Sequence, residues 1–175
     1  TLSSTHEGVR EATRHAIELA KEAGCIITFD PNLRPPLWKS LDDAKAEIEY
    51  GMSKCDVLKI SDNEVEFMCG TTDYDKGAAM IQEKYHIPLI LVTMGKEVAP
   101  FLQENTIETT GAGDTFCAST LNYVLDHGLD DLTEENLKEL LTFANAAASL
   151  ITTRKGALRV MPTREEVESF IASRQ

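Results

Sequence analysis

The stretch TTGAGDTF occupies residues 109–116, where small residues fill a turn and a helix is expected to follow at once, from 113 to about 126. Gly111 and Gly113 let the backbone adopt positive φ and come close to a ligand. A helix that begins there presents N–H groups without intrahelical partners and roughly half a positive charge. The turn is therefore predicted to bind an anion such as a phosphate.

Asp114 falls in the first turn of this helix. A carboxylate beside a bound phosphate opposes simple anion binding, but it suits a base that accepts a proton from an attacking hydroxyl group. The alternative is a tight loop in which the aspartate only starts a helix. The chain has no GxxxxGK[ST] phosphate loop, and this turn lacks the third glycine of a dinucleotide fingerprint. On these residues alone, the catalytic and the structural interpretations both stay open.

Outside this turn, apolar runs and helical periodicity alternate along the chain. Buried strands are predicted at 25–29, 57–60 and 88–93, and helices at about 4–24, 61–70, 75–85, 113–126, 133–152 and 163–175, with a further helix that starts at 40 and carries Leu41, Ala44 and Ile48. Such alternation implies an α/β fold with a mostly parallel sheet flanked by helices. Asp30, Ser61 and Thr93 follow or end the three strands, at the sheet edge where such folds bind ligands.

Helix starts are marked by pairs of residues that can form capping boxes. The pairs are Ser4 with Glu7, Ser61 with Glu64, and Thr163 with Glu166. Ser40 with Asp43 marks the start of another helix. These local signals predict where four helices begin.

Composition limits the classes of partner. The chain has 175 residues and a net charge of −12, so its surface should repel nucleic acid and anionic membranes. No apolar run is long enough to cross a bilayer, and the first residues lack the basic start and apolar stretch of a signal peptide. We expect a cytoplasmic protein with small-molecule ligands.

Four cysteines, at positions 25, 55, 69 and 117, are widely spaced and form no CxxC pair. This spacing favours reduced thiols over a zinc site or a disulfide framework. Cys25 and Cys117 lie in apolar stretches, so we expect both thiols to be buried.

TTGAGDTF resembles the second signature of the PfkB family of carbohydrate kinases, whose pattern is DTTGAGD. The resemblance implies that Gly111, Ala112 and Gly113 form an anion hole for the transferred phosphoryl group. It also implies that Asp114 contacts the sugar and deprotonates its hydroxyl group. In many members the start of this motif helps to bind a monovalent cation. The candidates here are Thr110 and Glu108, and Glu108 replaces the usual aspartate.

Two further stretches resemble the family in the same order along the chain. DPNLRPPLW is similar to the D-x-N-x-R-x-x-L-W stretch of fructokinase-like members, which implies that Arg34 contacts the substrate. LKISDNEVEFMCG is similar to the N-x-x-E segment that acts near magnesium and the phosphates. Glu64 matches its glutamate and would hold Mg²⁺ through water, whereas Ser61 replaces the frequent asparagine. The alternatives are that Glu64 only caps a helix and that Arg34 is a surface residue.

The resemblance continues to the C-terminal end. LVTMGK is similar to a strand-end motif beside the nucleotide, which implies roles for Thr93 and Gly95 in ATP binding. FANAAASLITTRKGAL is similar to the stretch that lines the adenine pocket, with Asn145 and Gly156 as candidates. MPTREEV matches the usual C-terminal ending, so the resemblance covers nearly the whole chain.

Taken together, the resemblance implies a three-layer ribokinase-like fold and transfer of the γ-phosphoryl group of ATP to a sugar, with fructose as the first expectation. The alternatives are a kinase for 2-keto-3-deoxygluconate, ribose or a nucleoside. A different class is a non-catalytic nucleotide-binding homologue, and the presence of both Asp114 and Glu64 speaks against it. The expected cofactors are ATP and Mg²⁺, with K⁺ as a further candidate, and a homodimer is a candidate assembly.

Two parts of the family pattern have no match in this sequence. Members are much longer, and their N-terminal part supplies a lid sheet and most sugar contacts. We therefore interpret residues 1–175 as the C-terminal nucleotide-binding and catalytic part of one domain. The family also has a hairpin before DTTGAGD, whereas here Glu97 runs directly into Val98. We expect a hairpin's worth of residues to be absent between them.

Overall fold

The computed structural model describes residues 4–95, 101 and 105–174. The chain forms two compact units, Thr1–Met94 and Gly95–Gln175. The predicted missing segment between residues 97 and 98 lies outside the described residues. Within the described ranges, none of the helices combines the length and the apolar composition that a membrane crossing requires.

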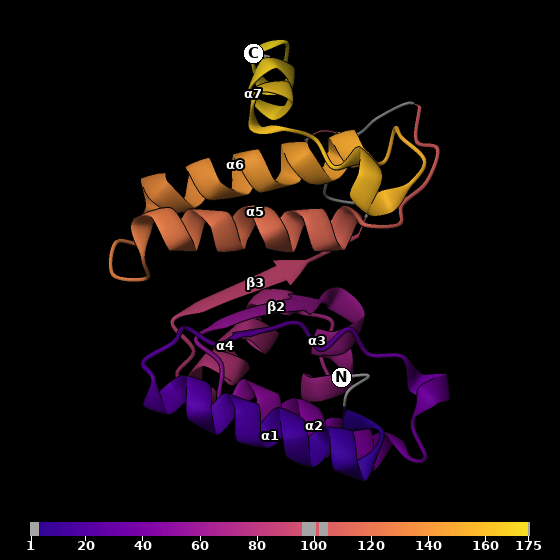
Figure 1. Ribbon diagram of the computed structural model, residues 1–175, viewed down its shortest axis with the longest axis vertical. Coiled ribbons are helices and arrows are strands. Elements are labelled where there is room, and N and C mark those ends of the chain that lie inside the picture. Colours follow the sequence, from indigo (N-terminus) through magenta and orange to yellow (C-terminus); the bar gives the residue numbers. More distant parts are fainter. Residues whose placement is uncertain (1–3, 96–100, 102–104, 175) are drawn as a thin grey trace. The chain divides into compact units, whose positions relative to one another are not determined.

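The first unit is built around a parallel sheet (Figure 1). Its elements are α1 (Glu7–Glu22), β1 (Thr28–Phe29), the 3₁₀ helix η2 (Pro35–Leu37), α2 (Leu41–Met52), β2 (Val57–Ser61), α3 (Asp62–Cys69), α4 (Tyr74–Tyr85) and β3 (Leu89–Thr93). The strand order is β1-β2-β3, and Phe29 pairs with Leu58 while Ser61 pairs with Thr93. The predicted parallel pairing is confirmed, so the residues at the carboxyl ends of the strands share one edge.

The core of this unit lies between the sheet and its helices. Leu58 and Ile60 of β2 pack with Ile48 of α2, Val65 of α3 and Ile81 of α4. Each side chain of this size contributes about 1.5–3 kcal/mol when it is fully buried. β2 is paired on both sides and packed by three helices, so it fixes the position of the residues that follow it at Ser61.

The first strand differs from its prediction. Residues 25–29 were expected to form a buried strand, but only Thr28 and Phe29 are in the sheet, and Cys25 is exposed. β1 is the edge strand of the described sheet, so a neighbouring strand covers it on one side only. The N–H of Ile27 donates to the carboxylate of Asp56 (2.7 Å), which satisfies the backbone just before the ladder begins. Cys117, also predicted to be buried, is partly exposed.

Three of the four predicted helix starts are confirmed. Ser40 caps α2, and complete capping boxes start α3 and the helix Arg164–Ala172 (α7). The box predicted at Ser4 is wrong, because the N-cap of α1 is His6 and no side chain caps it. Glu7 is already the first helical residue, whereas a capping box needs the glutamate in the third position. The carbonyl of Ser4 instead accepts hydrogen bonds from the Arg10 guanidinium (2.8 and 3.0 Å).

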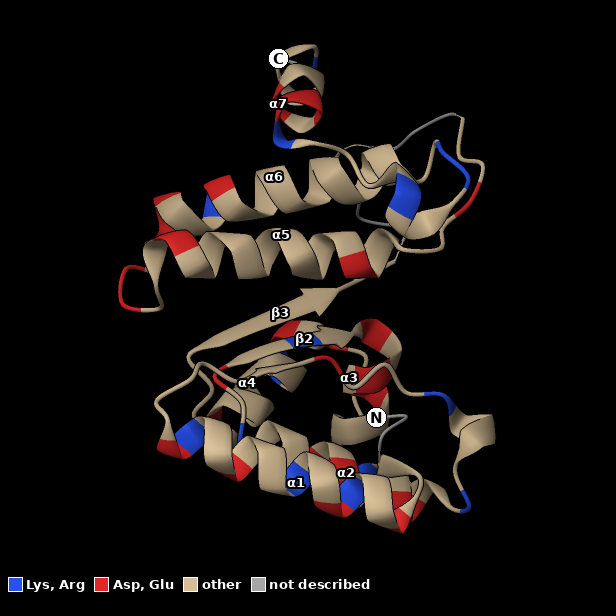
Figure 2. Cartoon of the chain, viewed as in Figure 1, with Lys and Arg blue, Asp and Glu red and all other residues tan. Residues whose placement is uncertain are grey.

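Ion pairs join α1 to α2, and charged segments of both signs line these two helices in Figure 2. Arg14 donates to the carboxylate of Glu47 at 2.7 Å, and Arg10 lies 3.4 Å from the same oxygen. Glu47 is buried, so two cations compensate a carboxylate that would otherwise be costly to remove from water. Charge complementarity therefore holds α1 on α2.

The second unit is helical among its described residues. It contains α5 (Ala112–His127), α6 (Glu134–Ile151), the 3₁₀ helix η3 (Ala157–Val160) and α7 (Arg164–Ala172), close to the predicted ranges. α5 and α6 lie side by side (Figure 1), with Phe116 and Val124 of α5 and Leu140 and Ala144 of α6 buried. This packing sets the start of α5 beside the residues that end α6.

Candidate active site

The glycine turn is closed by its own backbone. Gly111 is the N-cap of α5 with φ 86° and ψ −4°, a left-handed conformation that glycine adopts readily. The N–H of Thr115 donates to the carbonyl of Gly111 (2.8 Å), and the N–H of Ala112 donates to the carbonyl of Thr109 (3.2 Å). The helix thus begins at Ala112, directly after the left-handed residue.

These bonds narrow the set of amides that could bind an anion. The N–H of Ala112 is used inside the turn. In the described part of the chain, the N–H groups of Gly113 and Asp114 have no acceptor. The Asp114 side chain is exposed, and none of the described residues binds its carboxylate. One helix turn therefore carries two open N–H donors and an accessible carboxylate.

The chain before the turn is fixed to the end of α6. The N–H groups of Ile107 and Glu108 both donate to the carbonyl of Thr152, at 2.8 and 3.1 Å. Thr152 is the C-cap of α6, so a carbonyl that the helix leaves without an intrahelical partner is satisfied by the approaching segment. Glu108 is partly buried and Thr110 is exposed.

The turn also lies against the residues that follow α6. A Cβ atom built at Gly111 would be 3.4 Å from Cδ1 of Ile151 and 3.7 Å from Cα of Ala157. Gly156 has φ 134° and Ala157 has φ 45°. An alanine in the left-handed region costs roughly 1–2 kcal/mol, and such strain tends to cluster at functional sites. The structure thus brings the predicted Gly111 and Gly156 together and adds Ala157, which no sequence signal marked.

Asn145 and Gly95 are the remaining candidates in this unit. Asn145 lies on α6, and its side-chain amide donates to the carbonyl of Leu141 (2.7 Å). Its own helix therefore satisfies one of its donors. Gly95 follows β3, is exposed, and has φ 55°.

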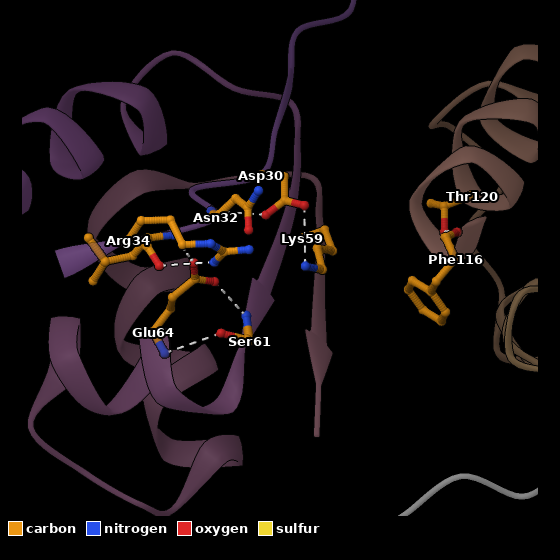
Figure 3. Close-up of polar contacts among 9 residues, drawn as sticks. Asp30, Asn32, Arg34, Lys59, Ser61, Glu64, Phe116 and Thr120 are labelled. Carbon is orange, nitrogen blue, oxygen red and sulfur yellow. Dashed lines mark hydrogen bonds and ion pairs between the residues drawn. The ribbon is translucent and has the colours of Figure 1, made fainter. Parts of the chain in front are cut away.

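A second group of candidates lies at the carboxyl edge of the sheet in the first unit (Figure 3). Ser61 and Thr93 end neighbouring strands in register. Asp30 follows β1, accepts the N–H of Asn32 (3.1 Å) and pairs with the Lys59 ammonium group (3.2 Å). Sequence reasoning missed Lys59, although a lone lysine inside the apolar strand VLKIS could have indicated it.

Glu64 is held by backbone N–H groups on both carboxylate oxygens. Oε1 accepts the N–H of Leu33 (2.6 Å) and Oε2 accepts the N–H of Ser61 (2.9 Å), with the residue only 5% exposed. Arg34, next to Leu33, is exposed and donates from Nη1 to the Leu33 carbonyl (3.1 Å). Figure 3 shows this set of contacts around the Glu64 carboxylate.

This arrangement bears on metal binding. The described residues contain no group of three or more acidic, histidine or cysteine side chains that could hold a metal ion. Mg²⁺ usually keeps several waters and is held by one or two carboxylates together with substrate phosphates. The predicted Glu64 could contribute to such a site only if it reached the ion while still bonded to Leu33 and Ser61. Its geometry therefore does not fit direct coordination of Mg²⁺, and the contact through water stays a prediction.

The chain matches a known family of proteins over most of its length. The family profile described as "pfkB family carbohydrate kinase" matches residues 3–164. The chain belongs to the pfkB family of carbohydrate kinases. The match includes the turn at Gly111 and the residue Asp114, whose roles stay predictions.

Individual pfkB relatives extend this result. The chain is 37% identical over 182 residues to probable fructokinase-2 of Arabidopsis thaliana, covering 98% of this chain and 55% of that protein. It matches the ATP-bound fructokinase of Xylella fastidiosa with a TM-score of 0.85 and 28% identity, over 99% of this chain and 60% of that one. It also matches the fructokinase of Vibrio cholerae O395 with fructose, ADP and calcium ion. The TM-score is 0.83 and the identity is 27%, over 97% of this chain and 58% of that one.

These matches settle the fold class of the pfkB chain. It is an α/β protein of the ribokinase-like type, with a parallel sheet flanked by helices, as predicted. The chain spans 55–60% of the length of these three relatives.

Proposed function

We propose that the complete protein is an ATP-dependent sugar kinase that transfers the γ-phosphoryl group of ATP to a hydroxyl group of fructose. The observation that carries this proposal is the first turn of α5, where an exposed carboxylate at Asp114 stands beside open N–H donors. Mere anion binding would not require that carboxylate. Relatives that are 36–37% identical and are named fructokinases support fructose as the acceptor.

In this mechanism Asp114 is the general base. Its carboxylate accepts the proton of the sugar hydroxyl as the oxygen attacks the γ-phosphorus, a role worth roughly 10²–10⁴-fold in rate. The N–H groups of Gly113 and Asp114 stabilise negative charge on the moving phosphoryl group, supported by the positive end of the α5 dipole. Gly111 makes this possible because its left-handed backbone starts the helix at that point. Ala112 supports the turn through its bond to Thr109.

The remaining predicted residues are proposed to bind the nucleotide and the sugar. The residues assigned to ATP are Asn145, Gly156, Gly95, Thr93 and Ser61, and their support is the resemblance of the surrounding stretches to the family's nucleotide motifs. The structure of the Xylella fastidiosa fructokinase with bound ATP, which matches 99% of this chain, supports ATP as the nucleotide. The exposed guanidinium of Arg34 is assigned to the sugar.

Metal ions are proposed to arrive with the substrate. Mg²⁺ would accompany ATP on its phosphates, where it neutralises charge. The residues at the glycine turn fit a γ-phosphate because they supply N–H donors. For K⁺, Glu108 and Thr110 are the candidate ligands, and a Vibrio cholerae O395 fructokinase variant solved with fructose, ADP and potassium ion supports testing it.

The wider context of the protein is also a proposal. We propose a cytoplasmic enzyme, since it would use cellular ATP, and a homodimer as the assembly to test. The stretch matched in fructokinase-2 runs over 182 residues, more than the 175 of this chain, so that relative has residues without a counterpart here. We propose that these residues would fall between residues 97 and 98. A non-catalytic nucleotide-binding homologue is the alternative that the experiment below must exclude.

The test is ADP release by the complete natural protein with MgATP and a panel of fructose, ribose, 2-keto-3-deoxygluconate and adenosine. We expect turnover with fructose and a fall of roughly 10²–10⁴-fold in kcat for Asp114→Asn, with ATP affinity nearly unchanged. Asp126→Asn is the matched control, because Asp126 is exposed on the same helix and its carboxylate forms a long, exposed ion pair with Arg164 (3.7 Å). Loss of ATP binding in Asp114→Asn, with no turnover by the natural protein, would favour a binding homologue.

A further inference from the structure

Two carboxylates hold consecutive backbone amides in the loop after β1. The N–H of Asn32 donates to Oδ1 of Asp30 (3.1 Å), and the N–H of Leu33 donates to Oε1 of Glu64 (2.6 Å). Asp30 is itself fixed by the Lys59 ammonium group of β2 (3.2 Å), whose side chain is only 12% exposed. The loop is therefore bonded both to the neighbouring strand β2, through Lys59, and to helix α3, through Glu64 (Figure 3).

The anchor on the helix side is rigid. Glu64 is the third residue of α3 and completes a capping box with Ser61, whose N–H donates to Oε2 (2.9 Å). A carboxylate in the first helix turn is favoured by the helix dipole, and N–H bonds to an ionised acceptor are among the stronger hydrogen bonds. Because Glu64 is buried and both oxygens have donors, its carboxylate is oriented without any ligand.

Leu33 transmits this orientation to Arg34. The backbone of Leu33 is bound twice, through its N–H to Glu64 and through its carbonyl to Nη1 of Arg34 (3.1 Å). Asn32, just before it, has φ 44°, a left-handed conformation in which asparagine is one of the few common non-glycine residues. A loop with this bend holds its shape only when the contacts around it fix it. The guanidinium of Arg34 therefore depends on a carboxylate thirty residues further along the chain.

We infer that Glu64 is a positioning residue, which fixes the guanidinium of Arg34 through the backbone of Leu33 and does not hold a metal ion itself. This inference rests on the proposed function only in assigning Arg34 to the sugar. A guanidinium presents planar N–H donors that match the oxygens of a sugar or of its phosphorylated product. The Asp30–Lys59 pair is the second support of the same loop.

Backbone exchange tests the positioning without relying on activity. In the complete protein, free of nucleotide and metal, Glu64→Gln keeps the side-chain shape but offers only one acceptor oxygen for two N–H groups. We expect amide hydrogens in peptides covering residues 30–38 to exchange on the order of tenfold faster, which corresponds to the loss of one hydrogen bond to a charged group. Glu66→Gln, an exposed carboxylate on the same helix, should leave this exchange unchanged. Unchanged exchange in Glu64→Gln overturns the inference.

Kinetics separates positioning from metal binding. We expect Glu64→Gln to raise the KM for fructose roughly tenfold, as expected for one lost charged hydrogen bond, while kcat and the Mg²⁺ concentration for half-maximal rate stay near their natural values. Arg34→Ala should raise the same KM, and adding Glu64→Gln to it should raise it little further, because both act through one contact. A raised Mg²⁺ requirement, or additive effects on KM, contradicts positioning.

The exchange experiment and the kinetic experiment can each contradict the inference without the other. If Glu64→Gln does not fold, Arg34→Ala still decides, because Arg34 is exposed and its loss leaves the Glu64–Leu33 bond in place. An unchanged KM for fructose in an active Arg34→Ala enzyme overturns the inference. If the natural protein phosphorylates no sugar, the proposed function fails, whereas the exchange experiment still reports whether Glu64 holds the loop.

Discussion

Replacing Gly111 with alanine tests the glycine turn directly. Gly111 has φ 86°, and the added Cβ would lie 3.4 Å from Cδ1 of Ile151 and 3.7 Å from Cα of Ala157. The first contact is close but tolerable and the second is ordinary, so steric overlap adds little. The main penalty is that of an L-residue in the left-handed region, about 1–2 kcal/mol in the free energy of unfolding. We expect a loss of stability of that size.

The same substitution should lower the rate of phosphoryl transfer. Relief of the strain at residue 111 rotates the peptide planes that follow it, so the N–H groups of Gly113 and Asp114 turn away from their common direction. Loss of one aligned donor to developing negative charge costs roughly 10²–10³-fold in kcat. The expected signature is therefore a modest loss of stability with a large loss of kcat.

The matched control is Gly128→Ala at the opposite end of α5. Gly128 is the C-cap, with φ 75° and ψ −164°, and a Cβ there would meet nothing within 4 Å. This region of backbone conformation is essentially restricted to glycine, so the loss of stability should be at least as large. Its kcat should stay near the natural value, because the first turn of α5 is untouched.

The assay combines urea unfolding, which gives the free energy of unfolding, with steady-state ADP release at saturating ATP and fructose. If Gly111→Ala loses stability but keeps its kcat, the turn does not stabilise the transferred group and the reasoning is refuted. If both variants lose kcat in proportion to stability, the effect comes from unfolding alone. If Gly111→Ala loses no stability, residue 111 does not have the left-handed backbone conformation in the folded protein.

Two other predictions concern the first unit. Gly77→Ala should lower the free energy of unfolding by about 1–3 kcal/mol, because the new Cβ would lie 2.3 Å from Cγ1 of the buried Val65. Gly8→Ala in α1 should be neutral or stabilising by up to about 1 kcal/mol, because a Cβ at that position meets nothing within 4 Å. If both variants lose the same free energy of unfolding in urea, the close packing of Gly77 against Val65 is contradicted. A thiol reagent at pH 8 should label the exposed Cys25 well before the buried Cys55, because burial raises the pKa of the Cys55 thiol to about 12. Mass spectrometry of labelled peptides checks this, and equal labelling of the folded protein would show that Cys55 is accessible.

Local sequence predicted much of the fold because the interactions concerned are local. The helix starts at Ser61 and Thr163 depend on side chains three residues apart, and both are confirmed. The glycine turn and its helix depend on backbone conformation at Gly111, which glycine alone adopts without strain. β3 was predicted from a run of apolar residues and lies within one residue of its prediction.

The predictions that failed concern features that depend on tertiary packing. The run at residues 25–29 is apolar, yet only Thr28 and Phe29 join the edge of the described sheet, and Cys25 before them is exposed. Apolar sequence indicates that a strand can be buried, but the number of neighbouring strands is a property of the whole sheet. Ala157, strained beside Gly111, was missed because only packing against the end of α6 places it there.

The sequence by itself determined the pfkB motifs, the alternation of strands and helices, and the identity of Asp114 and Glu64 as candidate residues. Only the tertiary structure assigned the Glu64 carboxylate to the backbone of Leu33 and paired Lys59 with Asp30. These partners lie about thirty residues apart, and they meet because parallel strands in register bring their carboxyl ends to one edge. Residue type fixes which groups can form hydrogen bonds, whereas strand register fixes which partners they reach.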